Sequence, residues 1–164
     1  MTAAAAPPVR ILIADDDDLF AKALVASLQR VRGLDIVGRA ADGLEAVELV
    51  SSLVPDVVLM DIAMPRLDGI SATRRITDAG TGTRVLIVSA MTDAETAGRA
   101  RSAGAAAYFF KGCSTDDLVA AIREVAPSPN LDASTATWGA GGGTAPLDRL
   151  ELLERLPAAA AVAQ

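Results

Sequence analysis

Short apolar runs and longer helical patterns alternate five times along the first 126 residues of the chain. The apolar runs have the length and the aliphatic content of β-strands, and several are unbroken, as in strands that are buried on both faces of a parallel sheet. The expected strands are 9–14, 34–38, 56–60, 84–88 and 106–110. The second is the weakest and is expected at an edge of the sheet.

Each expected strand is followed by apolar residues at helical spacing. Capping signals indicate where several of the helices begin, and glycine or proline indicates where they end. The expected helices are 19–31 before Gly33, a helix from the capping box Asp42-x-x-Glu45 through Leu53, one after Gly69 to Ala79, one from the capping box Thr92-x-x-Glu95 to Gly104, and one capped by Ser114 or Thr115 and running to Val125.

Five β-α units in a row predict an α/β domain over residues 9–126, built on an open parallel sheet with helices on both faces. Parallel strands need crossover connections, and these connections are right-handed. Residues 1–8 are expected to be a disordered N-terminus. Residues 127–146 are rich in Pro, Ser, Thr, Ala and Gly, which predicts a flexible linker.

Residues 147–164 are expected to form a short amphipathic helix and a tail, because the leucines of 147–156 make one apolar stripe. About ten residues of helix are marginal in water by themselves. The segment therefore either docks on its own domain, has no role, or binds a partner or a second copy of the chain.

Composition narrows the function classes. The net charge of −6 makes the chain a poor general nucleic-acid binder but leaves room for a cation site. The absence of histidine excludes histidine-based acid–base catalysis and most zinc sites. A single cysteine, Cys113, excludes an internal disulfide. Neither a signal peptide nor a membrane span is evident, so a cytoplasmic protein without membrane contact is expected.

Polar side chains follow four of the five expected strands at their carboxyl ends. In an open parallel sheet, ligands bind beyond that edge, near the point where the strand order reverses. We therefore expect these side chains to gather in one place. They are Asp15 and Asp16 after the first strand, Asp61 after the third, Ser89 after the fourth and Lys111 after the fifth.

Three carboxylates at one edge repel one another and raise each other's pKa unless a cation lies among them. Oxygen ligands with room for water favour Mg²⁺ as that cation. The metal would neutralise an incoming phosphoryl group while a carboxylate acts as nucleophile and forms an acyl phosphate. Lys111 would hold one phosphoryl oxygen, and Ser89 could donate a hydrogen bond to another.

Four motifs occur in order: Ile-Leu-Ile-Ala-Asp-Asp at 11–16, Val-Leu-Met-Asp-x-x-Met-Pro-x-x-Asp-Gly at 58–69, Leu-Ile-Val-Ser-Ala at 86–90, and Gly-Ala-x-x-Tyr-x-x-Lys at 104–111. With these motifs the chain resembles the receiver domains of two-component response regulators. It is most similar to NarL/FixJ regulators, in which the lysine also tends to lack a following proline; Gly112 is found here. The resemblance implies a doubly wound, flavodoxin-like sheet with strand order 2-1-3-4-5.

The resemblance also implies a role for each matching residue. Asp61 matches the phosphoacceptor and a metal ligand, Asp16 the direct metal ligand, and Asp15 the second acidic residue, which usually reaches the metal through water. The backbone carbonyl of Ala63 matches a further metal ligand. Lys111 matches the phosphate-binding lysine.

Two further residues match the parts that respond to phosphorylation. Ser89 matches the switch hydroxyl, which moves toward the phosphate, and Tyr108 matches the switch aromatic residue, whose ring swings inward. In the family these movements reshape the face made by the fourth helix, the fifth strand and the fifth helix. The phosphate thereby biases two existing states.

The four consecutive aspartates allow two assignments of the acidic pair. The strand's last apolar residue is Ala14, which favours the acidic pair Asp15 and Asp16 over Asp16 and Asp17. In the family, the positions two residues after the phosphoacceptor and two after the switch hydroxyl tune how long the phosphate lasts. Ala63 and Met91 occupy them, and neither side chain can orient an attacking water, so slow self-dephosphorylation is expected.

Two other functions compete with a phosphoacceptor signalling domain that is not an enzyme. Asp15-x-Asp17 is similar to the start of the haloacid-dehalogenase phosphatase loop, but Leu19 stands where Thr or Val is found in that family, and a cap domain is not evident. The second alternative is a receiver-like binding module that works without phosphorylation.

The resemblance implies a sensor histidine kinase as partner and leaves a homodimer open. NarL/FixJ regulators usually carry a C-terminal helix-turn-helix of about 60 residues that binds DNA, and 38 residues follow Ala126 here. DNA binding is therefore expected only through an output domain that is not evident in this chain, and contact with a downstream protein is the slightly preferred output.

Overall fold

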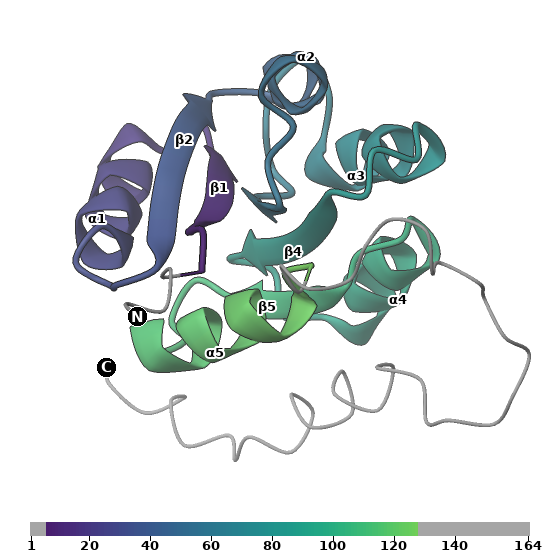
Figure 1. The fold of residues 1–164 in the computed structure, drawn as a ribbon. Helices are drawn as coiled ribbons and strands as arrows, with labels where there is room; N and C mark the ends of the chain where they lie inside the picture. Colours follow the sequence, from purple (N-terminus) through teal and green to yellow (C-terminus); the bar gives the residue numbers. More distant parts are fainter. Residues whose placement is uncertain (1–5, 128–164) are drawn as a thin grey trace, which may run out of the picture.

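Five parallel strands pair in the order β2-β1-β3-β4-β5 in the computed structural model, which describes residues 6–127 (Figure 1). The strands are β1 (Val9–Ala14), β2 (Leu34–Ala40), β3 (Val57–Met60), β4 (Arg84–Ser89) and β5 (Ala107–Phe110). The helices are α1 (Asp18–Leu28), α2 (Gly43–Leu53), α3 (Gly69–Asp78), α4 (Ala94–Ser102) and α5 (Thr115–Val125). The predicted doubly wound fold and strand order are confirmed.

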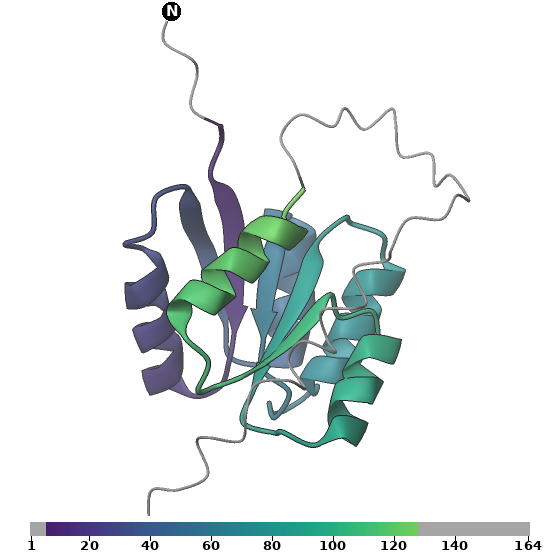
Figure 2. The ribbon, with the colours of Figure 1, turned by 90° about the horizontal axis from the view of Figure 1, so that it is seen from below.

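The helices cover both faces of the sheet, as Figure 2 shows from below. Side chains of a strand alternate between the two faces, so each strand contributes to both halves of the core. Ile11 and Ile13 pack with α1 and α5 on one face. Leu12 and Ala14 belong to the core on the other face, which α2, α3 and α4 cover. The core is mainly aliphatic, since only 3% of the chain is aromatic, and Tyr108 and Phe109 are the buried aromatic residues of the described range.

The second strand is longer than predicted. It runs to Ala40, at the edge of the sheet as expected, and its register against β1 shifts by one residue: Ile11 lies opposite Ile36, but Leu12 lies opposite Gly38. A bulge of this kind adds one residue to a strand and hides its alternation. A side chain at Gly38 would contact Leu53 of α2 and Leu12 of β1, so this glycine allows these two leucines to pack closely against β2.

The first helix is shorter than predicted, because it spans Asp18–Leu28 and ends five residues before Gly33. Gly33 has a φ of 82° in the turn before β2, so it serves the turn and not the helix end. Asp17 caps this helix, and its carboxylate accepts a hydrogen bond from the amide of Phe20 at 3.0 Å.

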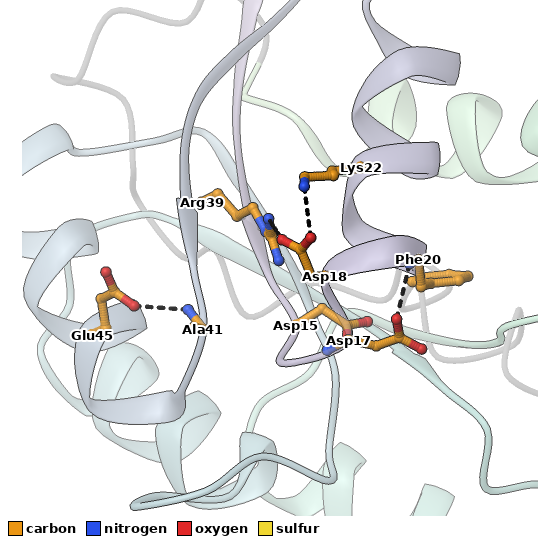
Figure 3. Close-up of polar contacts among 8 residues, drawn as sticks. All are labelled: Asp15, Asp17, Asp18, Phe20, Lys22, Arg39, Ala41 and Glu45. Carbon is orange, nitrogen blue, oxygen red and sulfur yellow. Dashed lines mark hydrogen bonds and ion pairs between the residues drawn. The ribbon is translucent and has the colours of Figure 1, made fainter.

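One capping box was predicted correctly and one was wrong. The Asp42 carboxylate accepts hydrogen bonds from the amides of Leu44 and Glu45, and Glu45 in return accepts from the amide of Ala41 at 2.7 Å (Figure 3). The fourth helix begins after Asp93 and not after Thr92. Asp93 has the extended backbone of a cap and accepts from the Thr96 amide at 2.7 Å, so the start moves by one residue.

The expected flanking segments fall mostly outside the described residues. Of the predicted disordered residues 1–8, residues 6–8 are described, and they are exposed and without regular structure. The predicted linker 127–146, apart from Pro127, and the predicted helix and tail 147–164 lie outside the described range. Within that range, no helix has both the length and the apolar content needed to cross a membrane.

Candidate functional site

Three carboxylates lie together at the carboxyl edge of the sheet. One oxygen from each of Asp15, Asp16 and Asp61 can be chosen so that all three lie within 4.8 Å of one another. Asp15 and Asp61 are the first residues after the adjacent central strands β1 and β3, which explains why they meet. Their exposed fractions are 2% and 5%, whereas Asp16 is exposed to solvent. The predicted gathering of these three side chains is what the structure shows.

Lys111 follows β5 and reaches back to this cluster. Its ammonium nitrogen lies 2.7 Å from Oδ2 of Asp15 and 3.4 Å from Oδ2 of Asp61. The same nitrogen lies 4.5 Å from the centre of the Phe20 ring, a cation–π contact. Burial acts to lower the pKa of Lys111, but the hydrogen bond to Asp15 and the charge of Asp61 outweigh it, so the pKa is raised and the ammonium stays charged.

The ionised carboxylate of Asp61 is disfavoured by its surroundings. Burial, followed by the charge of Asp15, raises the pKa of its carboxyl above the usual value, while Lys111 and the hydrogen bond from the Ile62 amide at 2.8 Å act against this. The backbone at Asp61 is also tightly packed. A Cβ atom added to Gly69, the first residue of α3, would lie 1.9 Å from the carbonyl oxygen of Asp61, so only glycine fits there.

The loop between β1 and α1 is held from several sides (Figure 3). The amide of Asp17 donates a hydrogen bond to Oδ1 of Asp15 at 2.8 Å. Asp18 forms ion pairs with Lys22 at 2.7 Å and with Arg39 of β2 at 2.5 Å. Asp17 therefore serves as the cap of α1 and Asp18 as an ion-pair partner, while Asp15 and Asp16 remain with Asp61. Sequence reasoning did not single out Arg39, since nothing in a lone strand arginine indicates its partner.

Ser89 and Tyr108 are connected through the loop after β4. Ser89 is buried at the end of β4, and its hydroxyl oxygen accepts a hydrogen bond from the Met91 amide at 3.2 Å. Tyr108 of β5 is 8% exposed, and its hydroxyl donates to the Met91 carbonyl at 2.7 Å. Burial raises the pKa of this hydroxyl. The tyrosine ring thus lies inward, and Met91 links the two side chains through its backbone.

The loop between β3 and α3 is tied to α2. Ala63 is exposed in this loop. Arg66 has a φ of 65°, in the left-handed region, and its guanidinium lies 3.0 Å from Oδ2 of Asp42, the cap of α2. The Gly43 amide also donates to the Leu67 carbonyl at 3.1 Å. The Arg66–Asp42 pair, which sequence reasoning missed, joins residues that are 24 positions apart.

The comparison with family models decides what kind of domain this is. The model described as the response regulator receiver domain matches residues 11–123. The chain belongs to the response regulator receiver family. This receiver is also 44% identical over 119 residues to the transcriptional regulatory protein PdtaR of Mycobacterium tuberculosis, and 36% identical over 117 residues to the response regulator GacA of Pseudomonas aeruginosa.

The two alignments cover 73% and 71% of this chain but only 57% and 55% of the relatives, so the receiver spans just over half their length. Solved structures of receiver domains also resemble this chain. The receiver domain of NarL from M. tuberculosis is 32% identical with a TM-score of 0.70, covering 72% of this chain and 95% of the other. The response regulator domain of Thermotoga maritima CheB is 34% identical with a TM-score of 0.66, and the match covers 76% of this chain and 98% of the other. The expected likeness to NarL-type receivers is confirmed.

Proposed function

We propose that this receiver accepts a phosphoryl group on Asp61 from a sensor histidine kinase, in a reaction that depends on Mg²⁺. The observation that carries the proposal is the meeting of Asp15, Asp16 and Asp61 with the Lys111 ammonium at one edge of the sheet. A carboxylate nucleophile, a cation site and a fixed positive charge are the parts that phosphoryl transfer to an aspartate needs.

Charge balance supports a divalent cation in this site. Three carboxylates and one ammonium leave two negative charges in a partly buried place. Burial, followed by the charge of Asp15, raises the pKa of Asp61 there. Carboxylate ligands suit Mg²⁺, which also keeps several waters. Asp16, Asp61, the carbonyl of Ala63 and, through water, Asp15 would hold it. When bound, the cation would neutralise charge on the phosphoryl oxygens. A similar receiver, CheY of Borrelia burgdorferi, is known in a complex with CheX, BeF₃ and Mg²⁺; it is 28% identical to this chain.

Phosphoryl transfer from a phosphohistidine to Asp61 needs no reagent besides the two proteins and Mg²⁺. An oxygen of the Asp61 carboxylate attacks the phosphorus of a phosphohistidine, a P–O bond forms, the P–N bond breaks, and the imidazole leaves with the electron pair and takes up a proton. Lys111 compensates charge on the phosphoryl oxygens from its fixed place over Phe20. The reaction needs no histidine in this chain, because the kinase supplies it.

The same proposal assigns the switch to Ser89 and Tyr108. The Ser89 hydroxyl would turn from the Met91 amide toward the phosphate, and the loop after β4 would move with it. Tyr108 is bound to that loop through the Met91 carbonyl, so the movement would reach β5. Phe110, which is 42% exposed at the end of β5, would belong to the altered face formed by α4, β5 and α5.

Incubation with acetyl phosphate and Mg²⁺, followed by intact mass spectrometry, tests the proposal. The expected result is one added phosphoryl group in the wild type and in the control Asp116→Ala, whose side chain is exposed on α5, and none in Asp61→Ala or in EDTA. No adduct under any condition would instead support a module that works without phosphorylation. Hydrolysis of small phosphate esters that Asp15→Asn abolishes and Asp61→Asn leaves intact would support a phosphatase.

We place the receiver in the cytoplasm with its kinase, where it would act through its α4-β5-α5 face on a downstream protein or a second copy of itself. Transcriptional control would need a DNA-binding output domain. Molecular mass in solution with and without beryllofluoride separates the two partners: a mass that doubles with beryllofluoride supports a homodimer, and an unchanged mass supports a different partner.

A further inference from the structure

A groove of about 630 Å³ lies between α3 and α4, and none of its lining residues belongs to the carboxylate cluster. On α4 its lining residues are Glu95, Gly98, Arg99 and Ser102, which follow one another at helical spacing and form one stripe about two turns long. At 1.5 Å per residue the stripe is roughly 10 Å long. On α3 the lining residues are Ile70, Ser71, Arg74 and Arg75. The groove is thus an elongated trough between two helices.

The trough is strongly basic in an acidic protein. Three arginines line it against a single carboxylate, that of Glu95, whereas the whole chain has a net charge of −6. Within residues 6–127, no ion pair or side-chain hydrogen bond engages the guanidinium of Arg74, Arg75 or Arg99. Arg99 does interact with Asp93 at longer range, since its charge adds to the hydrogen bonds from Thr96 that lower the pKa of that carboxyl. By contrast, Arg39 and Arg66 elsewhere on the surface each have a carboxylate partner. Three like charges around one trough repel one another unless an anion lies between them.

The shape of the trough selects among anions. Small-molecule sites bury most of their ligand, and this groove is open along one side. Double-stranded nucleic acid would extend beyond the trough onto a surface of net negative charge, which disfavours it. A short acidic protein segment covers only the trough, and planar guanidinium groups pair well with carboxylates. About three extended residues span 10 Å.

Small residues keep the trough open. A Cβ atom built on Gly98 meets nothing within 4 Å, so the middle of α4 faces open space. Glycine in a helix interior costs roughly 0.5–1 kcal/mol relative to alanine, and nothing in the packing of α4 requires it at this position. A partner that occupies the space in front of Gly98 would explain why glycine is found there, because a side chain would block that space.

We propose that the α3–α4 groove binds an acidic segment of a partner protein, with Arg74, Arg75 and Arg99 pairing with its carboxylates. None of these residues belongs to the cluster around Asp61, but α4 is also part of the face that phosphorylation would alter, so binding is tested in the unphosphorylated protein. The complementarity of a local basic trough to an acidic segment favours specificity, since the remaining acidic surface repels the same segment elsewhere.

Fluorescence anisotropy of a fluorescein-labelled peptide of six glutamates, titrated with the full chain in low salt and EDTA, tests the proposal. The expected result is saturable binding that is absent for the matching peptide of six glutamines. Arg74→Glu/Arg75→Glu should weaken binding by about tenfold or more. Gly98→Leu should weaken it as strongly while leaving all charges in place, and should not lower the melting temperature, since leucine favours helix.

The control pair is on α4: Arg99→Glu should weaken binding, whereas Arg101→Glu reverses one charge on the same helix outside the groove and should not. Binding that falls equally in Arg101→Glu would show general charge attraction and overturn the proposal, as would no binding of the glutamate peptide. Tripolyphosphate that displaces the peptide and binds more tightly would assign the groove to a small anion instead. Binding that strengthens markedly in Glu151→Gln/Glu154→Gln would mean that the chain's own C-terminal segment is the occupant.

Discussion

Asp61 illustrates at the level of one residue how a reactive site opposes stability. Its pKa is raised mainly by burial and then by Asp15. An acid whose pKa is higher in the folded state than in the unfolded state destabilises the fold once it ionises, so this cost appears as the pH rises through the raised pKa and is present at neutral pH. The carboxylate is nevertheless the group that the proposed reaction uses.

We therefore predict that Asp61→Asn raises the free energy of unfolding by about 1 kcal/mol at pH 7.5 in EDTA, because a neutral amide replaces a buried charge beside Asp15. Urea denaturation measures this. Asp35→Asn, at an exposed position in β2, serves as the control and should change little. Added Mg²⁺ should raise the melting temperature of the wild type but not that of Asp61→Asn. A less stable Asp61→Asn protein would contradict the prediction.

Ala63 and Met91 lead to a prediction about the lifetime of the phosphorylated state. Ala63 offers only an exposed methyl group, and Met91 is 42% exposed with its amide bound to Ser89. Neither side chain can orient a water for attack on the acyl phosphate. The phosphorylated receiver, freed of donor in Mg²⁺ buffer, should decay with a half-life on the order of minutes or longer. Intact mass against time measures the decay, and loss within seconds would refute the prediction.

At the level of elements, substitution of two helix glycines by alanine is expected to change the stability in opposite directions. A side chain on Gly69 would collide with the backbone of Asp61, whereas one on Gly98 meets open space. Gly69→Ala should cost about 3 kcal/mol or more and displace the phosphoacceptor. Gly98→Ala should be neutral or stabilising by about 0.5–1 kcal/mol. Thermal denaturation and acetyl phosphate labelling of both variants measure this, and equal stabilities would contradict the close contact at Gly69.

The cap of α3 gives a pH-dependent expectation. Burial acts to raise the pKa of Asp68, but the hydrogen bonds from Ser71 and the Ile70 amide outweigh it, so the pKa is lowered. The stabilisation is present above the ordinary pKa of 3.8 and is lost as the pH falls through the lower folded value.

Asp68→Ala should thus cost about 1 kcal/mol at pH 7, and the difference from the wild type should shrink below pH 4. Asp68→Asn, which keeps the cap, is the control and should retain most of the stability at both pH values. Urea denaturation at several pH values checks this, and a difference that persists unchanged at low pH would count against a role of the charged cap.

Elements with strong local signals could be predicted from the sequence, and the misses have local physical reasons. The unbroken apolar strands β3 and β4 and the Asp42 cap were placed within one residue. The bulge between Ile36 and Gly38 hid the end of β2, because it interrupts the two-residue alternation. Thr92 and Asp93 are both good caps, and only the backbone of the loop shows which of them is used.

At the level of the whole molecule, the convergence of four strand ends followed from topology alone, but contacts between distant side chains did not. The sequence indicated that Asp15, Asp61 and Lys111 share an edge, since parallel strands end together. It could not indicate that Lys111 lies against Phe20, or that Arg74 and Arg99 line one trough, because these contacts depend on how helices rotate and pack. The basic groove was therefore visible only in the structure.

The overall charge yields a prediction for the 164-residue chain. With a net charge of −6, it should show no measurable binding to random-sequence duplex DNA at about 150 mM salt, because it cannot release enough counterions from the phosphates. Fluorescence anisotropy with a labelled duplex measures this, and the glutamate peptide of the groove experiment provides the contrast. Micromolar DNA binding would show that local basic surface outweighs the net charge.

The direction of the strands also has a practical consequence for handling the protein. β1 begins, and α5 ends, at the edge of the sheet opposite the carboxylate cluster, as the course of the chain in Figure 2 shows. The Arg123 guanidinium donates to the Arg32 carbonyl at that far edge at 3.1 Å. Affinity tags, fluorophores or surface linkers attached before Val9 or after Ala126 would leave from the side remote from Asp61, so immobilised protein should stay open to phosphodonors.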